Sequence, residues 1–389
     1  MHFGIRCYSD TLASEGIKEA VAKISSSSHV EFIHLSVDSF QKPTPFVSSS
    51  TDEGALSFNP NPHFYEKSKI KPTRAKQFKD MDVLGEVCKE AKKKEIQVYA
   101  VLNCLVNPAL LKRRPEYAQV SSSGAQSDEI YPLMCFVNPS VERYILSLAT
   151  DILSNYEVAG IEIEKLHYSV TPTFKTGNLT CFCKYCKAEA RNQGINIDGV
   201  KSRLRFFPKP FAQPQKIMEA SSSSPFSMNI KLVRSWTQLL GLSSWFQHRR
   251  HMVSEISGRI MIASRQANPD AMVGIDLCPD EVSWIAGHDD RALGKNLDCL
   301  YPILDEIVVH KGVNAITNEL RALRRKLGGV LREVKIYPIA IMSPSVSPSE
   351  TVKIMQSISN EADGLVLHAY GQIPVENLKA LGQNARRTE

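Results

Sequence analysis

The stretch Val158-Ala159-Gly160-Ile161-Glu162-Ile163-Glu164 alternates apolar and acidic side chains in the manner of a β-strand. Because successive side chains of a strand point to opposite faces, Glu162 and Glu164 share one face and the isoleucines share the other. Carboxylates on an inward face are costly to bury unless another group neutralises or uses them. The stretch therefore predicts a strand whose inner side carries charge.

Similar strand patterns recur along the chain, and helical patterns separate them. The expected strands span residues 2–8, 30–37, 96–102, 158–164, 271–277, 298–304, 334–341 and 364–368. The expected helices lie near residues 14–24, 81–94, 140–155, 245–267, 315–326 and 349–361. Eight strands that alternate with helices predict an α/β fold, a (β/α)8 TIM barrel formed by one domain over residues 1–389. A doubly wound sheet, the alternative, usually has a Gly-rich phosphate loop after its first strand, and residues 7–10 hold none.

Long polar stretches follow three of the expected strands. These insertions cover about residues 38–76, 103–137 and 169–235, after strands 2, 3 and 4. In a TIM barrel such connections lie at the C-terminal mouth, where barrel active sites are built. We therefore expect the functional residues at the strand ends that face this mouth.

Composition restricts the class of protein. The 389-residue chain is 43% hydrophobic and 23% charged and has a net charge of +6, as expected of a soluble globular protein. Its basic residues are scattered and no apolar run of about 18 residues occurs, so neither a nucleic-acid partner nor a membrane partner is expected. Nine cysteines, an odd number, without a signal-peptide pattern predict a cytoplasmic location.

The expected mouth carries carboxylates and aromatic rings, which suit a carbohydrate ligand. Glu164 and Asp276 end adjacent strands and are the predicted catalytic pair, with Glu164 as nucleophile or stabilising carboxylate. Adjacent strands lie about 4.8 Å apart, so the pair could have the spacing of a retaining or of an inverting glycosidase. Two close carboxylates also raise the pKa of one of them, which supplies an acid. The predicted substrate-binding residues are Arg6, Tyr8, His34, Asn103, Glu162, Asp280, Asp305 and His368.

Some of these residues have a structural interpretation as well. Arg6 could neutralise Glu162 inside the barrel, and His34 has the pattern of a hydrogen-bonded core histidine. Asp280 could belong to a surface loop or to the start of a helix. These alternatives stay open from the sequence.

A cluster of three cysteines, Cys181, Cys183 and Cys186, follows the acidic strand in a C-x-C-x-x-C pattern. Structural zinc takes four ligands in a tetrahedron, so a fourth ligand is needed. Cys135 is the predicted fourth ligand, and Cys104 is the second choice. We predict a closed, structural Zn²⁺ site. A redox or unmetallated thiol cluster is the main alternative. An iron–sulfur cluster is less favoured, because the spacing fits neither common ferredoxin pattern.

These motifs resemble a group of TIM-barrel glycoside hydrolases that includes the family 42 β-galactosidases and related uncharacterised hydrolase-like barrels. The resembling stretches are Asn138-Pro139-Ser140-Val141 with Arg143-Tyr144, Tyr156 to Glu164, Cys181 to Cys186, Trp245-Phe246 with Arg249 and Val253, Asn268-Pro269, and Asp363 to Val366 with Tyr370-Gly371. The similarity spans roughly residues 130–370. It implies the barrel fold, a carbohydrate ligand and the four-cysteine zinc site. Relatives that carry this site often associate, which leaves a homo-oligomer open.

The catalytic pair of family 42 does not carry over to this chain. That family uses an Asn-Glu pair after strand 4 and a glutamate on strand 7, whereas residues 335–342 contain no acid. The related hydrolase-like barrels usually carry aspartate at the position that matches Glu164. The sequence therefore predicts a glycoside hydrolase that acts through Glu164 and an acid of strand 5 or 6. A non-catalytic barrel that binds a carbohydrate or another polar ligand is the first alternative, and a metal-dependent hydrolase is the second.

Overall fold

Parallel strands close into a barrel in the computed structural model of the chain. The structure describes residues 2–28, 30–38, 54–126, 132–169, 179–204, 235, 238, 241–304, 313–341 and 346–388. The strands are β1 (His2–Tyr8), β2 (Phe32–Ser36), β3 (Gln97–Asn103), β4 (Gly160–Glu164), β5 (Met272–Leu277), β6 (Cys299–Leu304), β7 (Lys335–Ile336), β8 (Ile339–Ile341) and β9 (Gly364–His368). The ring closes because β1 pairs with β9 and β5 pairs with β6, and each of these pairings is parallel.

The predicted (β/α)8 TIM barrel is confirmed. Within the described part of the chain, β7 and β8 both pair with β6 and form one barrel strand in two halves, so the ring has eight strands. The halves are separated by Tyr337 and Pro338. Proline has no N–H to donate to a ladder, which accounts for the interruption. Every expected strand is present, and its bounds lie within two residues of the prediction.

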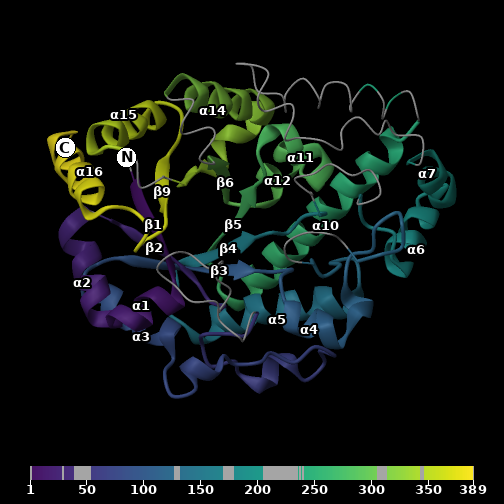
Figure 1. Ribbon diagram of the computed structural model, residues 1–389, viewed down its shortest axis with the longest axis horizontal. Helices are drawn as coiled ribbons and strands as arrows, with labels where there is room; N and C mark the ends of the chain where they lie inside the picture. Colours follow the sequence, from purple (N-terminus) through teal and green to yellow (C-terminus); the bar gives the residue numbers. More distant parts are fainter. Residues whose placement is uncertain are drawn as a thin grey trace.

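Helices cover the outside of the barrel (Figure 1). Those that the sequence analysis expected are α2 (Ile17–Ser28), α3 (Val83–Lys92), α5 (Pro139–Asn155), α10 (Ser243–Ala267), α14 (Val313–Leu327) and α15 (Pro348–Ser359). α11 (Asp280–Ala286) begins at Asp280, where the sequence analysis left a helix start open, and those that it did not expect are α1 (Ser9–Glu15), α4 (Pro108–Arg113), α6 (Lys184–Asn192), α7 (Ile197–Leu204), α12 (Asp290–Asn296) and α16 (Val375–Thr388). Short 3-10 helices are η1 (Pro62–Tyr65), η2 (Lys76–Phe78), η3 (Pro115–Tyr117) and η6 (Gly328–Arg332).

The last helix completes the outer layer next to the first ones. α16 packs against α2 and α15, and β9 pairs with β1, so the N- and C-terminal parts of the chain lie side by side (Figure 1). Among the helices that the structure describes, none combines the length and the apolar character needed to cross a bilayer.

Aromatic rings fill the N-terminal half of the barrel. The ring centroid of Phe32 lies 6.0 Å from that of Tyr99 and 5.7 Å from that of Tyr337, and Tyr301 stacks on Tyr337 at 6.1 Å. The space for one of these rings comes from Gly274, where a Cβ atom would lie 2.3 Å from Cε2 of Tyr301. Glycine in a strand often marks such a close approach.

Replacing Gly274 by alanine is therefore expected to lower the free energy of unfolding. An added methyl group must displace the Tyr301 ring and meets the Cys299 backbone, and overpacking of this kind costs about 1–3 kcal/mol. Gly329→Ala is the control, because an added Cβ there has no neighbour within 4 Å. Urea unfolding measures both variants. Equal stabilities would contradict this account of the barrel interior.

Candidate functional site

A buried cluster of charged side chains lies inside the barrel. Arg6 of β1, only 3% exposed, forms an ion pair with Glu162 of β4, and Glu162 also contacts Nδ1 of His34 on β2. Burial, together with the charge of Arg6, lowers the pKa of His34 well below its usual value, so the imidazole is neutral. Buried charges are stable only when they are paired. The contact between Arg6 and Glu162 is the one that the structural interpretation expected, and substrate binding by these residues stays a prediction.

His34 is also packed between rings. It stacks on Tyr99 with a centroid distance of 5.0 Å and meets the edge of Tyr301 at 5.4 Å. These contacts leave His34 with the environment of a core side chain.

Glu164 and Asp276 lie at the C-terminal ends of β4 and β5 and share the guanidinium of Arg6. Nη1 of Arg6 is 3.8 Å from Oε1 of Glu164, and Nη2 is 3.1 and 3.2 Å from the two carboxylate oxygens of Asp276. The Glu164 side chain is 19% exposed and that of Asp276 is 4% exposed. The two carboxyl groups therefore point toward the same place, one at the rim and one deeper in the barrel.

These two carboxyl groups differ in proton affinity. Burial raises the pKa of Asp276 to about 7; Arg6 opposes this shift and the charge of Glu164 adds to it. Burial acts in the same direction on Glu164, but the positive charges of Lys165 and Arg6 outweigh it, so the pKa of Glu164 is lowered. At neutral pH, Glu164 is ionised while Asp276 is partly protonated. Diverging pKa values of this kind are typical of an acid and its carboxylate partner.

Three other predicted residues lie close to this pair. Tyr8 and His368 are joined by a contact of 3.2 Å between the Tyr8 hydroxyl and Nε2 of His368. Burial and the charge of Glu164 raise the pKa of Tyr8, which keeps its hydroxyl protonated. Asn103 is in register with Glu164 on the neighbouring strand, and its buried Oδ1 has no hydrogen-bond partner among the described residues. An unpaired buried amide oxygen calls for a ligand or a water molecule.

Asp280 is not part of this group. It begins α11, its side chain is 52% exposed, and it forms an ion pair with Lys326 of α14. It lines a separate cavity of about 210 Å³ with Trp284 and Asp290. Asp280 is thus the start of a helix, which was one of its two structural interpretations. A role of Asp280 in substrate binding stays a prediction. Asp305 lies outside the described residues.

Two residues near Glu164 were not among the predicted site residues. Nζ of Lys165 is 3.9 Å from Oε1 of Glu164, and the φ angle of Lys165 is 56°, which is uncommon for a residue with a side chain and often found at functional sites. Asp38 is buried, and burial, together with the charge of Glu164, raises its pKa well above the usual value. It lines a cavity of about 20 Å³ with Asn103 and Tyr144, which is room for roughly one water molecule. The sequence signal for both is an ionisable residue just after a strand end.

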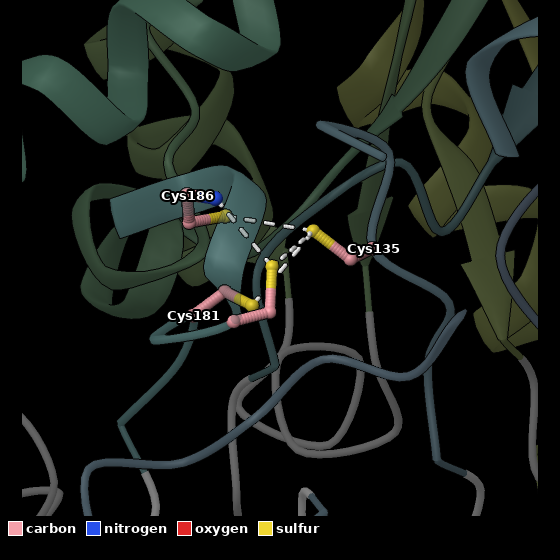
Figure 2. Close-up of side chains that lie close together, drawn as sticks. Cys135, Cys181 and Cys186 are labelled. Atoms are coloured by element: carbon pink, nitrogen blue, oxygen red, sulfur yellow. Dashed lines mark hydrogen bonds between the residues drawn. The ribbon is translucent and has the colours of Figure 1, made fainter. Parts of the chain in front are cut away.

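The four predicted metal-ligating cysteines come together at the mouth. Their sulfur atoms all lie within 4.8 Å of one another, and all four side chains are buried (Figure 2). Sγ of Cys135 is 3.5 Å from that of Cys186, 3.6 Å from that of Cys183 and 3.8 Å from that of Cys181. A disulfide would need about 2.05 Å, whereas a tetrahedron with metal–sulfur bonds of about 2.3 Å has sulfur atoms about 3.8 Å apart. The cluster could therefore hold a metal ion.

Backbone N–H groups donate hydrogen bonds to two sulfur atoms of this cluster. Cys183 is the N-cap of α6, and its sulfur accepts a hydrogen bond from the backbone N–H of Cys186 at 3.5 Å. The backbone N–H of Val120 donates to Sγ of Cys181 at 3.4 Å. Hydrogen bonds among the thiols lower the pKa of Cys183 and raise those of Cys135 and Cys186, so the four groups share negative charge and Cys183 is the one that favours the thiolate form. Cys104, the second choice, lines the small cavity beside Asp38 instead.

Comparison with family models and with curated proteins finds no match. Solved structures do match. The PgaB (BpsB) glycoside hydrolase domain from Bordetella bronchiseptica aligns with 100% of this chain and 97% of its own, with a TM-score of 0.60 and 13% identity. The α-L-fucosidase isoenzyme 2 from Paenibacillus thiaminolyticus aligns with 100% of this chain and 49% of its own, with a TM-score of 0.58 and 12% identity. A β-galactosidase from Marinomonas ef1 aligns with 100% of this chain and 59% of its own, with a TM-score of 0.57 and 10% identity.

The chain thus spans about half the length of the fucosidase and 59% of the galactosidase. At these identities the comparisons bear on the fold. The barrel is of the kind found in TIM-barrel glycoside hydrolases.

Replacing Asp276 by asparagine tests its raised pKa. The folded-state pKa of about 7 lies above the ordinary value of 3.8, so the proton on Asp276 stabilises the fold below about pH 4 and is lost as the pH rises through 7. The free energy of unfolding of the wild type, relative to that of Asp276→Asn, should fall by up to about 4 kcal/mol between about pH 4 and pH 8. Urea unfolding across this range measures the difference. Asp270→Asn, at an exposed position, is the control, and a difference that stays constant for Asp276→Asn would contradict the raised pKa.

Proposed function

We propose that this barrel is a glycoside hydrolase that cleaves O-glycosyl bonds with Glu164 and Asp276. The observation that carries the proposal is the pair of carboxyl groups on β4 and β5, which share Arg6 but differ in pKa. The likeness of the barrel to the PgaB glycoside hydrolase domain supports a carbohydrate as the ligand.

In the proposed reaction, the protonated Asp276 donates its proton to the glycosidic oxygen as the bond to the anomeric carbon breaks. The ionised Glu164 attacks that carbon or stabilises the positive charge that develops on the sugar ring. Arg6 and Lys165 keep Glu164 ionised, because both place positive charge beside it. If Glu164 forms a covalent intermediate, the deprotonated Asp276 then takes a proton from the attacking water.

The remaining polar groups of the mouth are proposed to bind sugar hydroxyls. The unpaired Oδ1 of Asn103 can accept a hydrogen bond, and the Tyr8 hydroxyl, which stays protonated, can donate one. His368 holds Tyr8 in place through their contact. The barrel interior below these groups is lined by Arg6, His34 and Glu162, which are proposed to set the charge and shape of the sugar-binding site.

We further propose that the cysteine cluster holds one structural Zn²⁺ ion. Four thiolates fill the tetrahedral positions of zinc and leave no open position for a catalytic water. Cys135 lies just before α5, which leads into β4, and the other three cysteines follow β4. A metal ion there would tie together the two segments on either side of the strand that carries Glu164.

The proposed function also includes predictions on domain organisation, location and partners. They are a single domain over residues 1–389, a cytoplasmic location and no nucleic-acid or membrane partner. All nine cysteines lie in the described ranges and none forms a disulfide, which supports a reducing compartment. A homo-oligomer stays a prediction.

A barrel that binds a carbohydrate without cleaving it is the second candidate. The observation that favours it is the double contact of Arg6 with Asp276, which gives this carboxyl group a structural role as well. The seventh barrel strand, Lys335–Ile336 with Ile339–Ile341, contains no acid that could replace it.

Hydrolysis of aryl glycosides tests the catalytic pair. Glu164→Gln and Asp276→Asn should each lower kcat by roughly 10²- to 10⁴-fold, and wild-type activity should fall as the pH rises through about 7, because Asp276 must be protonated. Asp270→Asn is the control and should keep full activity. Full activity in both site variants would refute the assignment. Binding of sugars by calorimetry without turnover of any glycoside would favour the second candidate.

Metal analysis tests the zinc proposal. Protein purified without added metal should contain about one zinc ion per chain, and Cys183→Ser should lose it and unfold at a lower temperature. Cys104→Ser is the matched control, since Cys104 is also buried but lies outside the cluster. Absence of zinc, or its retention in Cys183→Ser, would count against the site.

A further inference from the structure

A buried arginine near the cysteine cluster has no hydrogen-bond acceptor among the residues that the structure describes. Arg249 of α10 is 1% exposed, and none of its three guanidinium nitrogen atoms has a hydrogen-bond acceptor among the described residues. Burial lowers the pKa of Arg249 to about 10, so the group is still a cation at neutral pH. A buried cation without compensation destabilises a folded protein strongly. Something in its surroundings must therefore offset the charge.

Aromatic rings supply part of this compensation. The guanidinium carbon of Arg249 lies 4.4 Å from the ring centroid of Tyr168, 4.8 Å from that of Trp245 and 5.4 Å from that of Phe246. Such cation–π contacts stabilise a desolvated cation. The rings carry no net charge, however, so they orient the guanidinium without neutralising it.

The acidic groups that act on Arg249 include two thiols of the cysteine cluster. Among the described residues, Cys181 and Cys186 favour the charged form of Arg249, together with Tyr168. Aromatic rings also connect the cluster to the arginine: the ring centroid of Phe182, which lies between two of the cysteines, is 5.2 Å from that of Trp245, one of the rings beside the guanidinium. Four thiolates around one divalent metal ion carry a net charge of −2. A cation at this place offsets half of that charge.

We propose that Arg249 is the counter-ion of the metal-loaded cysteine cluster, a positioning residue outside the coordination sphere that strengthens metal binding. This inference rests on the proposed occupation of the cluster by a divalent metal ion. It explains why a guanidinium that finds no hydrogen-bond acceptor in the described part of the chain is retained in the interior. Residues around a metal site that are not ligands commonly change metal affinity by 10- to 100-fold.

The same contacts connect the cluster to the loop after β4. Tyr168, which covers Arg249, lies four residues after Glu164, and its ring packs on that of Phe136, the neighbour of Cys135, at 5.0 Å. Its backbone N–H donates to the carbonyl of Ala286 at 2.8 Å. Arg249 is thus held between the cluster and the segment that leads away from the mouth.

The test is the zinc affinity of variants at position 249, measured by competition with a chromophoric chelator. Arg249→Met should bind zinc roughly 10- to 100-fold more weakly than the wild type, and Arg249→Lys, which keeps the charge, should bind with an affinity between the two. Arg259→Met, on the same helix with a half-exposed side chain that pairs with Glu142, is the control and should match the wild type. Absorption of the Co²⁺-loaded variants reports whether the four-thiolate geometry is kept.

The outcomes separate the two proposals. A wild-type chain that binds no divalent metal overturns both the metal site and the role of Arg249. A wild-type chain that binds zinc tightly, with Arg249→Met equal to it, overturns the counter-ion role alone. If Arg249→Met does not fold, the zinc affinity of Arg249→Lys decides. A zinc affinity of Arg249→Lys as weak as that of Cys183→Ser contradicts the counter-ion role, because lysine keeps the positive charge. In the wild type, the ¹⁵N resonances of the Arg249 guanidinium should shift on addition of zinc, and no shift contradicts it.

Discussion

One buried cation, Arg6, determines the arrangement of the mouth. Its guanidinium contacts carboxylates from β4 and β5, so it draws together side chains that the barrel places on different strands. Three carboxylates face this one guanidinium, and the neighbouring His34 is neutral. Burial is the main reason why Asp276 holds a proton near neutral pH, and the charge of Glu164 adds to it. Glu164 lies closer to the rim, where Lys165 supplies a further positive charge, and it stays ionised. The pKa values of Asp276 and Glu164 thus differ because Asp276 lies deeper in the barrel and because Glu164 has a further positive charge beside it.

The strands could be predicted because their signal is local. A period of two in apolar residues, bounded by polar turns, is sufficient to locate each one. Several helices were missed because their signal is short or interrupted. α4 and α6 lie in stretches where a cap residue, Asn107 or Cys183, starts a helix of two to three turns without a long apolar stripe. α12 is short as well and depends on Asp289 as its cap.

The candidate site was predictable to the extent that strand register determines it. Strand ends bring Arg6, Glu162 and Glu164 to one place, and their spacing in the sequence indicates which of them face inward. Depth could not be predicted, since the difference in exposure between Glu164 and Asp276 depends on how neighbouring strands are staggered. Lys165 was missed because its position relative to Glu164 depends on a left-handed backbone angle that no side-chain pattern indicates. Asp280 was grouped with the site because it follows β5, but α11 turns it toward Lys326.

The cysteine cluster and the acidic strand are parts of one arrangement. Lys165, next to Glu164, has a φ angle of 56°, and such a conformation persists only where the surrounding structure holds it. The loop that follows is held from two sides: Gln119 donates to the carbonyl of His167 and accepts from the backbone N–H of Ser169, and Tyr168 packs on Phe136. Gln119 also accepts from Thr180, the residue before Cys181. A crosslink through the four sulfur atoms would therefore restrain the segment that follows Glu164. Such restraint is what a charged side chain at a barrel mouth requires if it is to keep one orientation toward a ligand.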